Sequence, residues 1–346
     1  MALHVMDEAN HCLGCKNPRC QEGCPIHTNI PEVIRLLKAN RLDDAGRMLF
    51  ENNPLTTVCS LVCNHENQCE GHCVRGIKGA LVHFSVIENY ISSTYASQMP
   101  HGPAPSNGKK AAIIGGGPTG MSAAYFLGRA GIPVTIFEKA DCLGGIVRQV
   151  IPSFRISDDA IDNDVALMFK MGVQVRLNTP APSVAELKAQ GFTHIFFAVG
   201  AWKAGKLDIP GNVVPVIGWL KDLKAGKEVS LGHVAVVGGG NTAMDAARAA
   251  LRAGAKSSTL IYRRTRKYMP ADAEELELAM ADGVQFLELV APVEQKDGRL
   301  VCKKMKLGEP DASGRRSPVE TGETVEIPCD TVISAVGEKV ESELFT

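Results

Sequence analysis

Two stretches of this sequence repeat one local pattern, in which an apolar run leads directly into a glycine-rich turn and then into a helical segment. The first apolar run covers residues 111–114 and its turn 115–120, and the second run covers 234–237 and its turn 238–243. A buried strand, a glycine turn and a helix form the phosphate-binding start of a dinucleotide-binding domain. Two copies therefore predict an α/β chain with two nucleotide-binding domains.

The first turn has the glycines that a bound pyrophosphate requires. Gly115 permits the tight turn, Gly117 lets the backbone approach the phosphates, and Gly120 lets the helix pack closely on the strand. Free N–H groups at the helix start attract the phosphate charge. Glu138 follows the next apolar run, 134–137, where a carboxylate can accept hydrogen bonds from a ribose. The site is predicted to bind a dinucleotide whose ribose is unphosphorylated, and it also includes Pro118 and Thr119.

The second turn differs in the residues that follow its next apolar run, 259–262. Arg263 and Arg264 stand where the first copy has an acid. An acid there favours NAD, whereas arginines favour the 2′-phosphate of NADP. A solvated basic surface is the alternative explanation of this run. The predicted NADP(H) site also includes the turn residues Gly238, Gly240, Asn241, Thr242 and Ala243, with side-chain donors from Asn241 and Thr242.

Eight of the 11 cysteines lie in two tight groups near the start of the chain. They are Cys12-x2-Cys15-x4-Cys20-x3-Cys24-Pro25 and Cys59-x3-Cys63-x5-Cys69-x3-Cys73. Thiols this dense bind metal or form disulfides. Helical periodicity over residues 30–50 predicts a helical connection that brings the two groups together.

Bulk composition separates these two possibilities. The formal net charge of −1 gives no sign of a nucleic-acid or membrane-surface partner. No apolar run is long enough to span a bilayer, and the first residues do not resemble a signal peptide. A cytoplasmic location is therefore expected, and in that reducing compartment dense cysteines favour metal over disulfides.

The motifs and the composition together divide the chain into five expected segments. Residues 1–96 form a helical cysteine domain, and 97–110 form a Gly- and Pro-rich linker. The simplest interpretation of two nucleotide sites is one domain inserted in another, with FAD in the first and a nicotinamide in the second. Residues 111–200 are then the first part of an FAD-binding domain, and 201–329 are an NADPH-binding domain nested within it. Residues 330–346 are expected to return to the FAD domain, with Gly337 as a further cofactor-binding residue. The segment after Glu138 offers further flavin contacts at Gly145, Arg148 and Arg155, although a turned loop with no ligand explains it equally.

Together these motifs resemble a family that includes the small subunit of bacterial glutamate synthase and the amino-terminal half of dihydropyrimidine dehydrogenase. The large subunit of the bifurcating NADH-dependent ferredoxin:NADP oxidoreductase is another member. The resemblance extends from Cys12 to Gly337. It rests on the first cysteine group, Asn53-Pro54-Leu55, Cys59-Ser60-Leu61-Val62-Cys63, the first glycine turn, Pro152-x-Phe154-Arg155 and the Gly-Gly-Gly-Asn-Thr-Ala-Met-Asp run from Gly238.

The resemblance implies a helical iron–sulfur domain with two [4Fe–4S] clusters, followed by two nested Rossmann-like domains for FAD and NADPH. Thiolates hold such clusters. By resemblance, one cluster is held by Cys12, Cys15, Cys20 and Cys73. The other is held by Cys24, Cys63 and Cys69 with Glu88 as a non-cysteine ligand. His83 is a weaker rival to Glu88, and Cys59 is expected to be free.

The implied activity is that of an NAD(P)H-dependent FAD and iron–sulfur oxidoreductase. Electrons would pass from NADPH through FAD to the clusters and on to a catalytic or electron-accepting partner subunit or domain. Relatives continue past Gly337 with a Gly-Asp that binds FAD, so the FAD domain is expected to be truncated at its carboxyl end. Two alternatives stay open: a nucleotide-binding scaffold with structural zinc, and an inactive fragment that binds only NADP.

Overall fold

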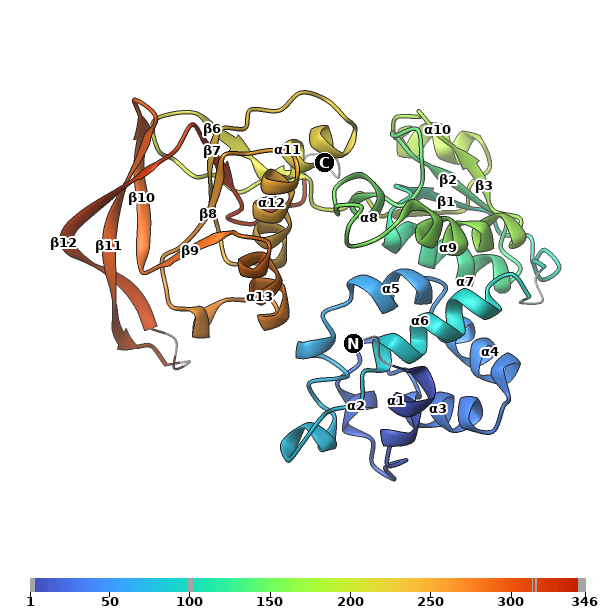
Figure 1. Ribbon diagram of the computed structural model, residues 1–346. Helices are drawn as coiled ribbons and strands as arrows, with labels where there is room; N and C mark the ends of the chain where they lie inside the picture. The colour runs from blue at the N-terminus through green and yellow to red at the C-terminus, as the bar shows by residue number, and fades with distance from the viewer. Residues whose placement is uncertain (1–3, 99–101, 313, 315, 342–346) are drawn as a thin grey trace. The chain divides into compact units, whose positions relative to one another are not determined.

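A computed structural model describes residues 4–98, 102–312, 314 and 316–341 (Figure 1). Residues 99–101 of the predicted linker and 342–346 of the predicted return segment lie outside the described residues. The chain forms two compact α/β units, Met1–Gln149 with Ser153–Gly200 and Val150–Pro152 with Ala201–Thr346.

The first unit begins with a helical region that has its own apolar core. Val33, Ile34 and Ile87 are fully or almost fully buried there, and Cys12 and Cys20 pack against this core. The cysteines therefore lie on apolar surface. The helices of this region are α1 (Val5–His11), α2 (Arg19–Glu22), α3 (Ile30–Lys38), α4 (Leu42–Asn52), α5 (Thr56–Val62) and α6 (Phe84–Tyr95), with 3₁₀ turns η1 (His65–Asn67) and η2 (Val74–Ile77).

The helix expected over residues 30–50 is two helices, and a turn at Asn40 separates them. Asn40 has φ of +57°, a left-handed conformation that asparagine tolerates. The Arg41 N–H donates to the Leu36 carbonyl at 2.9 Å, and the Asn40 N–H donates to the Leu37 carbonyl at 3.0 Å. These two bonds form a Schellman motif, which ends α3 and lets α4 fold back.

The second part of the first unit is a parallel sheet in the order β3-β2-β1-β4. Every residue of β1 and β2 is buried, as expected for strands covered on both faces. The strands are β1 (Ala111–Ile114), β2 (Val134–Phe137), β3 (Gln174–Arg176) and β4 (His194–Phe197), and the helices are α7 (Pro118–Arg129), α8 (Ile146–Gln149), α9 (Asp158–Lys170) and α10 (Val184–Ala189).

One buried acid joins the helical region to this sheet domain. Asp164 on α9 is fully buried and accepts a hydrogen bond from the Val58 N–H of α5 at 2.8 Å. Because Val58 lies in the first turn of α5, its N–H has no partner within that helix. Asp164 thus stabilises the start of a cysteine-bearing helix from another part of the chain. Burial raises the pKa of Asp164 to about 7.

The second unit is built on a parallel sheet in the order β6-β13-β7-β8-β9, beside an antiparallel sheet β10-β11-β12 and a small pair β14-β5. Its strands are β5 (Lys203–Ala204), β6 (Val213–Pro215), β7 (His233–Val237), β8 (Ser257–Tyr262), β9 (Gln285–Glu288), β10 (Val290–Lys296), β11 (Arg299–Pro310), β12 (Arg316–Pro328), β13 (Thr331–Ser334) and β14 (Glu338–Lys339). Its helices are α11 (Val216–Lys224), α12 (Asn241–Arg252) and α13 (Ala273–Ala281), with the 3₁₀ turn η3 (Arg266–Tyr268).

The segment expected to return to the FAD domain lies instead in this sheet. β13 is fully buried and pairs in parallel with β6 on one side and β7 on the other. β14 then pairs with β5 of the same unit. The apolar strand β13 thus completes the sheet between β6 and β7. The sequence pattern alone did not reveal this position.

Candidate functional site

Cysteines from both sequence groups line one cavity in the helical region. They are Cys12, Cys15 and Cys20 from the first group and Cys69 and Cys73 from the second. Burial raises the pKa of the Cys20 thiol to about 11, and the neighbouring thiols of Cys73, Cys12 and Cys15 contribute to the rise. The four residues of the first predicted cluster site therefore lie close together.

The residues of the second predicted cluster site gather around Cys69. This thiol is buried, and its pKa is raised first by burial and then by the charges of Glu70, Glu88, Cys63 and Cys24. Cys24 Sγ donates to Thr28 Oγ1 at 3.4 Å, and Cys63 Sγ donates to Gln68 Oε1 at 3.5 Å.

Glu88 lies on the buried face of α6. Its Oε1 accepts a hydrogen bond from Thr56 Oγ1 at 2.6 Å. Burial raises its pKa to about 7 against the effect of the Thr56 hydrogen bond, while Asp164 and Glu70 raise it further. His83, the rival to Glu88, lies 3.4 Å from Glu70 through Nδ1.

All eleven cysteines lie in the described residues, and none of them forms a disulfide there. Cys59, the cysteine predicted to be free, lies on α5, and burial raises its pKa to about 12. Cys302 and Cys329 are buried in the core of the second unit. Across the described residues, no three His, Cys, Asp or Glu side chains are arranged as ligands of a metal ion.

The first glycine turn is closed by contacts that exclude any side chain. Gly115 has φ of +107°, and a Cβ there would lie 2.4 Å from the Ala198 carbonyl oxygen. A Cβ on Gly120 would lie 2.0 Å from the Gly115 oxygen, and one on Gly145 would lie 2.8 Å from the Gly117 Cα. Pro118 and Thr119 begin α7 directly after the turn. The backbone N–H groups at this helix start are thus available to an anion.

Glu138 lies buried at the end of β2, next to the turn. Its Oε2 accepts from the Gly116 N–H at 2.6 Å, and its Oε1 accepts from the Ala140 N–H at 2.8 Å. A carboxylate has acceptor capacity for further hydrogen bonds. Glu138 is therefore held in place by the backbone and can still accept from a ribose hydroxyl.

Arg148 is held by groups of its own domain. Its Nε donates to the Leu143 carbonyl at 2.8 Å, and its guanidinium pairs with Asp162 and with Asp158 of α9. These contacts join α8 to α9. Arg155, the other arginine predicted near the flavin, is half-buried in the loop that precedes α9.

A cavity of about 760 Å³ opens beside the second glycine turn. This volume falls in the usual range of small-molecule sites, roughly 300–1,000 Å³. Six of the predicted cofactor residues line the cavity: Gly238, Gly240, Thr242, Arg263, Arg264 and Gly337. Lys206, Tyr262 and Lys339 also line it, and the sequence analysis did not select them.

The two arginines of this cavity differ. Arg263 is exposed, whereas Arg264 is buried and donates from Nε to the Arg316 carbonyl of β12 at 3.1 Å. The antiparallel sheet thus fixes Arg264, and Arg263 presents its charge to solvent.

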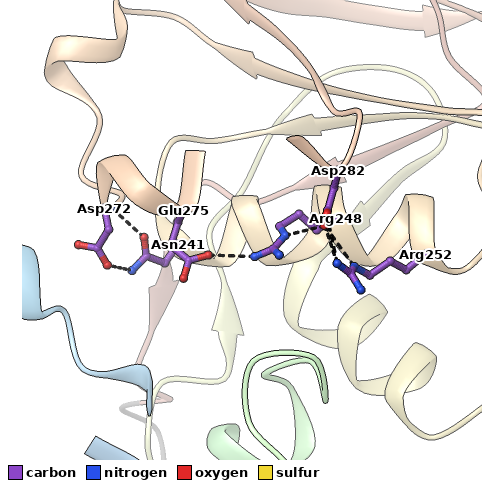
Figure 2. A network of polar contacts seen from close by, with 6 residues as sticks. All are labelled: Asn241, Arg248, Arg252, Asp272, Glu275 and Asp282. Carbon is purple, nitrogen blue, oxygen red and sulfur yellow. Dashed lines mark hydrogen bonds and ion pairs between the residues drawn. The ribbon is translucent and has the colours of Figure 1, made fainter. Parts of the chain in front are cut away.

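The side chain of Asn241, predicted as a donor at the NADP(H) site, is hydrogen-bonded to another segment of the chain. Asn241 Nδ2 donates to Asp272 Oδ2 at 2.9 Å, and the Asp272 N–H donates to Asn241 Oδ1 at 3.0 Å (Figure 2). Further along the same helices, Arg248 donates to Glu275 and Asp282, and Arg252 also binds Asp282. These ion pairs fix α13 against α12.

Asp164 is the buried polar residue that the sequence analysis missed most clearly. It lies three residues after Ile161 and four residues before Met168, and both of these side chains are buried. Helical periodicity alone therefore places Asp164 on the inner face of α9. An acid at such a position signals a hydrogen-bond partner.

Each of the two parallel sheets has a strand that leads into a glycine turn. An acid follows the next strand in the first sheet, and arginines follow the next strand in the second. Together they define an oxidoreductase with two nucleotide-binding sites. Residues 109–346 match the pyridine nucleotide-disulphide oxidoreductase family, and residues 2–99 match dihydropyrimidine dehydrogenase domain II, 4Fe-4S cluster. The chain thus combines an iron–sulfur domain with FAD- and NADP-binding oxidoreductase domains.

Among relatives, the chain is 39% identical over 340 residues to the putative oxidoreductase YgfK of Escherichia coli, a match that covers 95% of this chain and 33% of that protein. It is 32% identical over 360 residues to the NADPH glutamate synthase small chain of Azospirillum brasilense, covering 96% of this chain and 74% of that one. The chain therefore belongs to the family of the glutamate synthase small chain. It spans about a third of the first relative.

A solved histamine dehydrogenase from a Rhizobium species has a similar fold, with a TM-score of 0.58 and 16% identity. The similarity covers 96% of this chain and 48% of that one. Among the described residues, none of the helices is long and apolar enough to cross a membrane.

Proposed function

We propose that this chain is the electron-transfer part of a larger NADPH-dependent oxidoreductase. When bound, FAD would supply a hydride acceptor that can release single electrons, and [4Fe–4S] clusters would supply single-electron carriers. The chain's own residues hold these groups and set their surroundings. The first glycine turn with Glu138 would hold FAD, and the cavity lined by Gly238, Arg263 and Arg264 would hold NADP(H).

The observation that carries the proposal is the meeting of Cys73 with Cys12, Cys15 and Cys20 around one cavity. Cys73 comes from the second cysteine group, far along the chain from the other three thiols, so the fold and not sequence proximity brings it to them. Four thiols on an apolar wall suit an iron–sulfur cluster. The grouping of Cys24, Cys63 and Glu88 around Cys69 supports a second cluster.

The family match also favours iron–sulfur over the zinc scaffold. Because one relative is named a small chain, we infer that this chain also works with a partner subunit or domain that holds the final electron acceptor. The glycine turns, Glu138 and the arginine-lined cavity favour the electron-transfer role over a fragment that binds only NADP. A cytoplasmic location stays a prediction.

Anaerobic purification followed by iron and sulfide analysis tests the proposal. Two clusters of four irons give about eight iron atoms per chain, and the reconstituted protein should oxidise NADPH with an artificial acceptor. Cys73→Ala should remove about half of the iron. Cys59→Ala, on the same region but outside both sets, should keep all of it. Protein without iron, or equal iron loss in both variants, would refute the assignment.

A further inference from the structure

The segment that connects β8 to α13, residues 265–272, lies against the second glycine turn. We name this segment the strap. Pro270 of the strap lines the same cavity as Gly239 and Gly240 of the turn. The strap begins directly after Arg263 and Arg264, so it continues the segment that carries these two arginines.

Three sets of hydrogen bonds tie the strap down. Near its middle, Tyr262 Oη donates to the Tyr268 carbonyl at 2.7 Å. At its end, the Ala271 N–H donates to the Gly239 carbonyl of the turn at 3.0 Å. The last set is the reciprocal pair between Asn241 and Asp272 (Figure 2).

The Asn241–Asp272 pair requires a particular chemistry at each position. The Asn241 amide donates to a carboxylate through its nitrogen and accepts from a backbone N–H through its oxygen. An aspartate at 241 would place two carboxylates against each other. Exchanging the two residue types, with aspartate at 241 and asparagine at 272, would restore both hydrogen bonds. Position 272 is the N-cap of α13, where asparagine is as favourable as aspartate.

We propose that Asn241 and Asp272 are positioning residues that clamp the strap to the glycine turn and thereby set the preference for NADPH over NADH. This inference rests on the proposed NADP(H) site. NADPH must reach the turn with its pyrophosphate and the arginines with its 2′-phosphate at the same time. NADH lacks the 2′-phosphate, so its affinity depends on the turn and little on the strap.

Dissociation constants for NADPH and NADH test the clamp. They are measured by titration calorimetry on the holoprotein reduced beforehand with dithionite under anaerobic conditions, so that no hydride is transferred during the titration. Asn241→Asp should weaken NADPH binding about tenfold, which corresponds to the loss of about one hydrogen-bonded pair. NADH binding should change less than about twofold. Asn241→Ala removes the clamp without adding repulsion, so it should weaken NADPH binding in the same direction if the aspartate variant does not fold.

The double exchange of Asn241→Asp with Asp272→Asn provides the decisive arm. It should return the NADPH dissociation constant to within about twofold of the original protein. Asp222→Asn is the matched control. Asp222 lies on α11 of the same unit, and the substitution breaks its exposed ion pair with Lys227, so the dissociation constants of both nucleotides should stay unchanged.

Two outcomes would overturn the clamp. One is a double exchange that binds NADPH as weakly as Asn241→Asp alone, and the other is an equal loss of NADPH and NADH affinity in the single variants. If the unaltered holoprotein binds neither nucleotide, the proposed NADP(H) site itself fails together with the clamp. Iron content, flavin content and melting temperature are measured for every variant.

Discussion

The two glycine turns use one backbone device with opposite charges beside it. In the first, the Glu138 carboxylate is buried and accepts two backbone N–H groups. In the second, Arg263 and Arg264 occupy the equivalent place, and Arg264 is held by a carbonyl of β12. We expect the turn to hold a phosphate in both cases, and the residue after the next strand to select the ribose. Phosphate binding and ribose selection are therefore assigned to separate residues of the sequence.

The turns also differ in how tightly the helix packs on the strand. The third glycine of the first turn, Gly120, would place a Cβ 2.0 Å from the Gly115 oxygen. The second turn has Ala243 at that position, fully buried and accommodated. The two turns are similar in sequence, but α7 and α12 therefore lie at different positions relative to their strands.

The largest expected effect comes from Gly120→Ala, which would give the first turn the residue of the second. The added methyl meets backbone that cannot move aside, so the free energy of unfolding should fall by about 3 kcal/mol. FAD retention after gel filtration and thermal melting report the change.

Ala243→Gly is the reverse exchange and serves as its control. It should cost only about 1 kcal/mol through helix propensity and leave FAD bound. Equal effects of the two exchanges would show that the turns are packed alike.

Arg263→Ala should come next in size. Loss of an exposed arginine that contacts a phosphate should weaken NADPH binding about tenfold or more and leave NADH binding nearly unchanged. Arg299→Ala, which removes an exposed ion pair with Glu326, is the matched control. A parallel loss for both nucleotides would mean that Arg263 does not read the 2′-phosphate.

Glu138→Gln should weaken FAD binding by about fivefold. An amide nitrogen would replace one of the two oxygens that accept from Gly116 and Ala140, leaving one N–H without its acceptor. FAD titration of apoprotein measures this, with NADPH affinity as the internal control. Unchanged FAD affinity would contradict the role assigned to the acid.

The smallest effect is a difference in pH dependence between the units. Burial raises the pKa of Asp164 to about 7, so its protonated form favours the folded state, and the stability it contributes is lost as the pH rises through 7. The pKa of Asp282 is lowered, first by its hydrogen bond from Arg248, so its contribution is lost as the pH falls through that lowered pKa.

Melting temperatures between pH 5 and 8 test this contrast. Relative to the original protein, Asp164→Asn should gain a few degrees as the pH rises. Asp282→Asn should lower the melting temperature by the same amount throughout this range, because the contribution of Asp282 is lost only below the ordinary carboxyl pKa of 3.8. The same pH trend in both variants would show that the two carboxylates are not in opposite environments.

The sequence predicted the elements whose signals are local. Strands 111–114 and 134–137 have the predicted bounds, because a short apolar run and the turn after it are both visible in the sequence. The family resemblance likewise implied the grouping of Cys73 with Cys12. What the sequence could not reveal depends on partners far along the chain. Asn241 is taken up by Asp272, and β13 finds its place between β6 and β7 only in the folded sheet.

Asn40 is an intermediate case. The apolar periodicity of residues 30–50 continues across it, so the pattern predicts one helix. The break depends on one left-handed residue and two backbone bonds. Asparagine is among the few residues that adopt this conformation readily, so Asn40 was the feature of the sequence that could have predicted the break.

The position of Cys73 beside Cys12 has a consequence for how the protein is made. The two proposed sets of ligands are interleaved along the chain, since Cys24 belongs to one set and both Cys20 and Cys73 to the other. Neither set is complete until synthesis has passed residue 73. Iron delivery would then act on the whole amino-terminal region and not on one short segment of it.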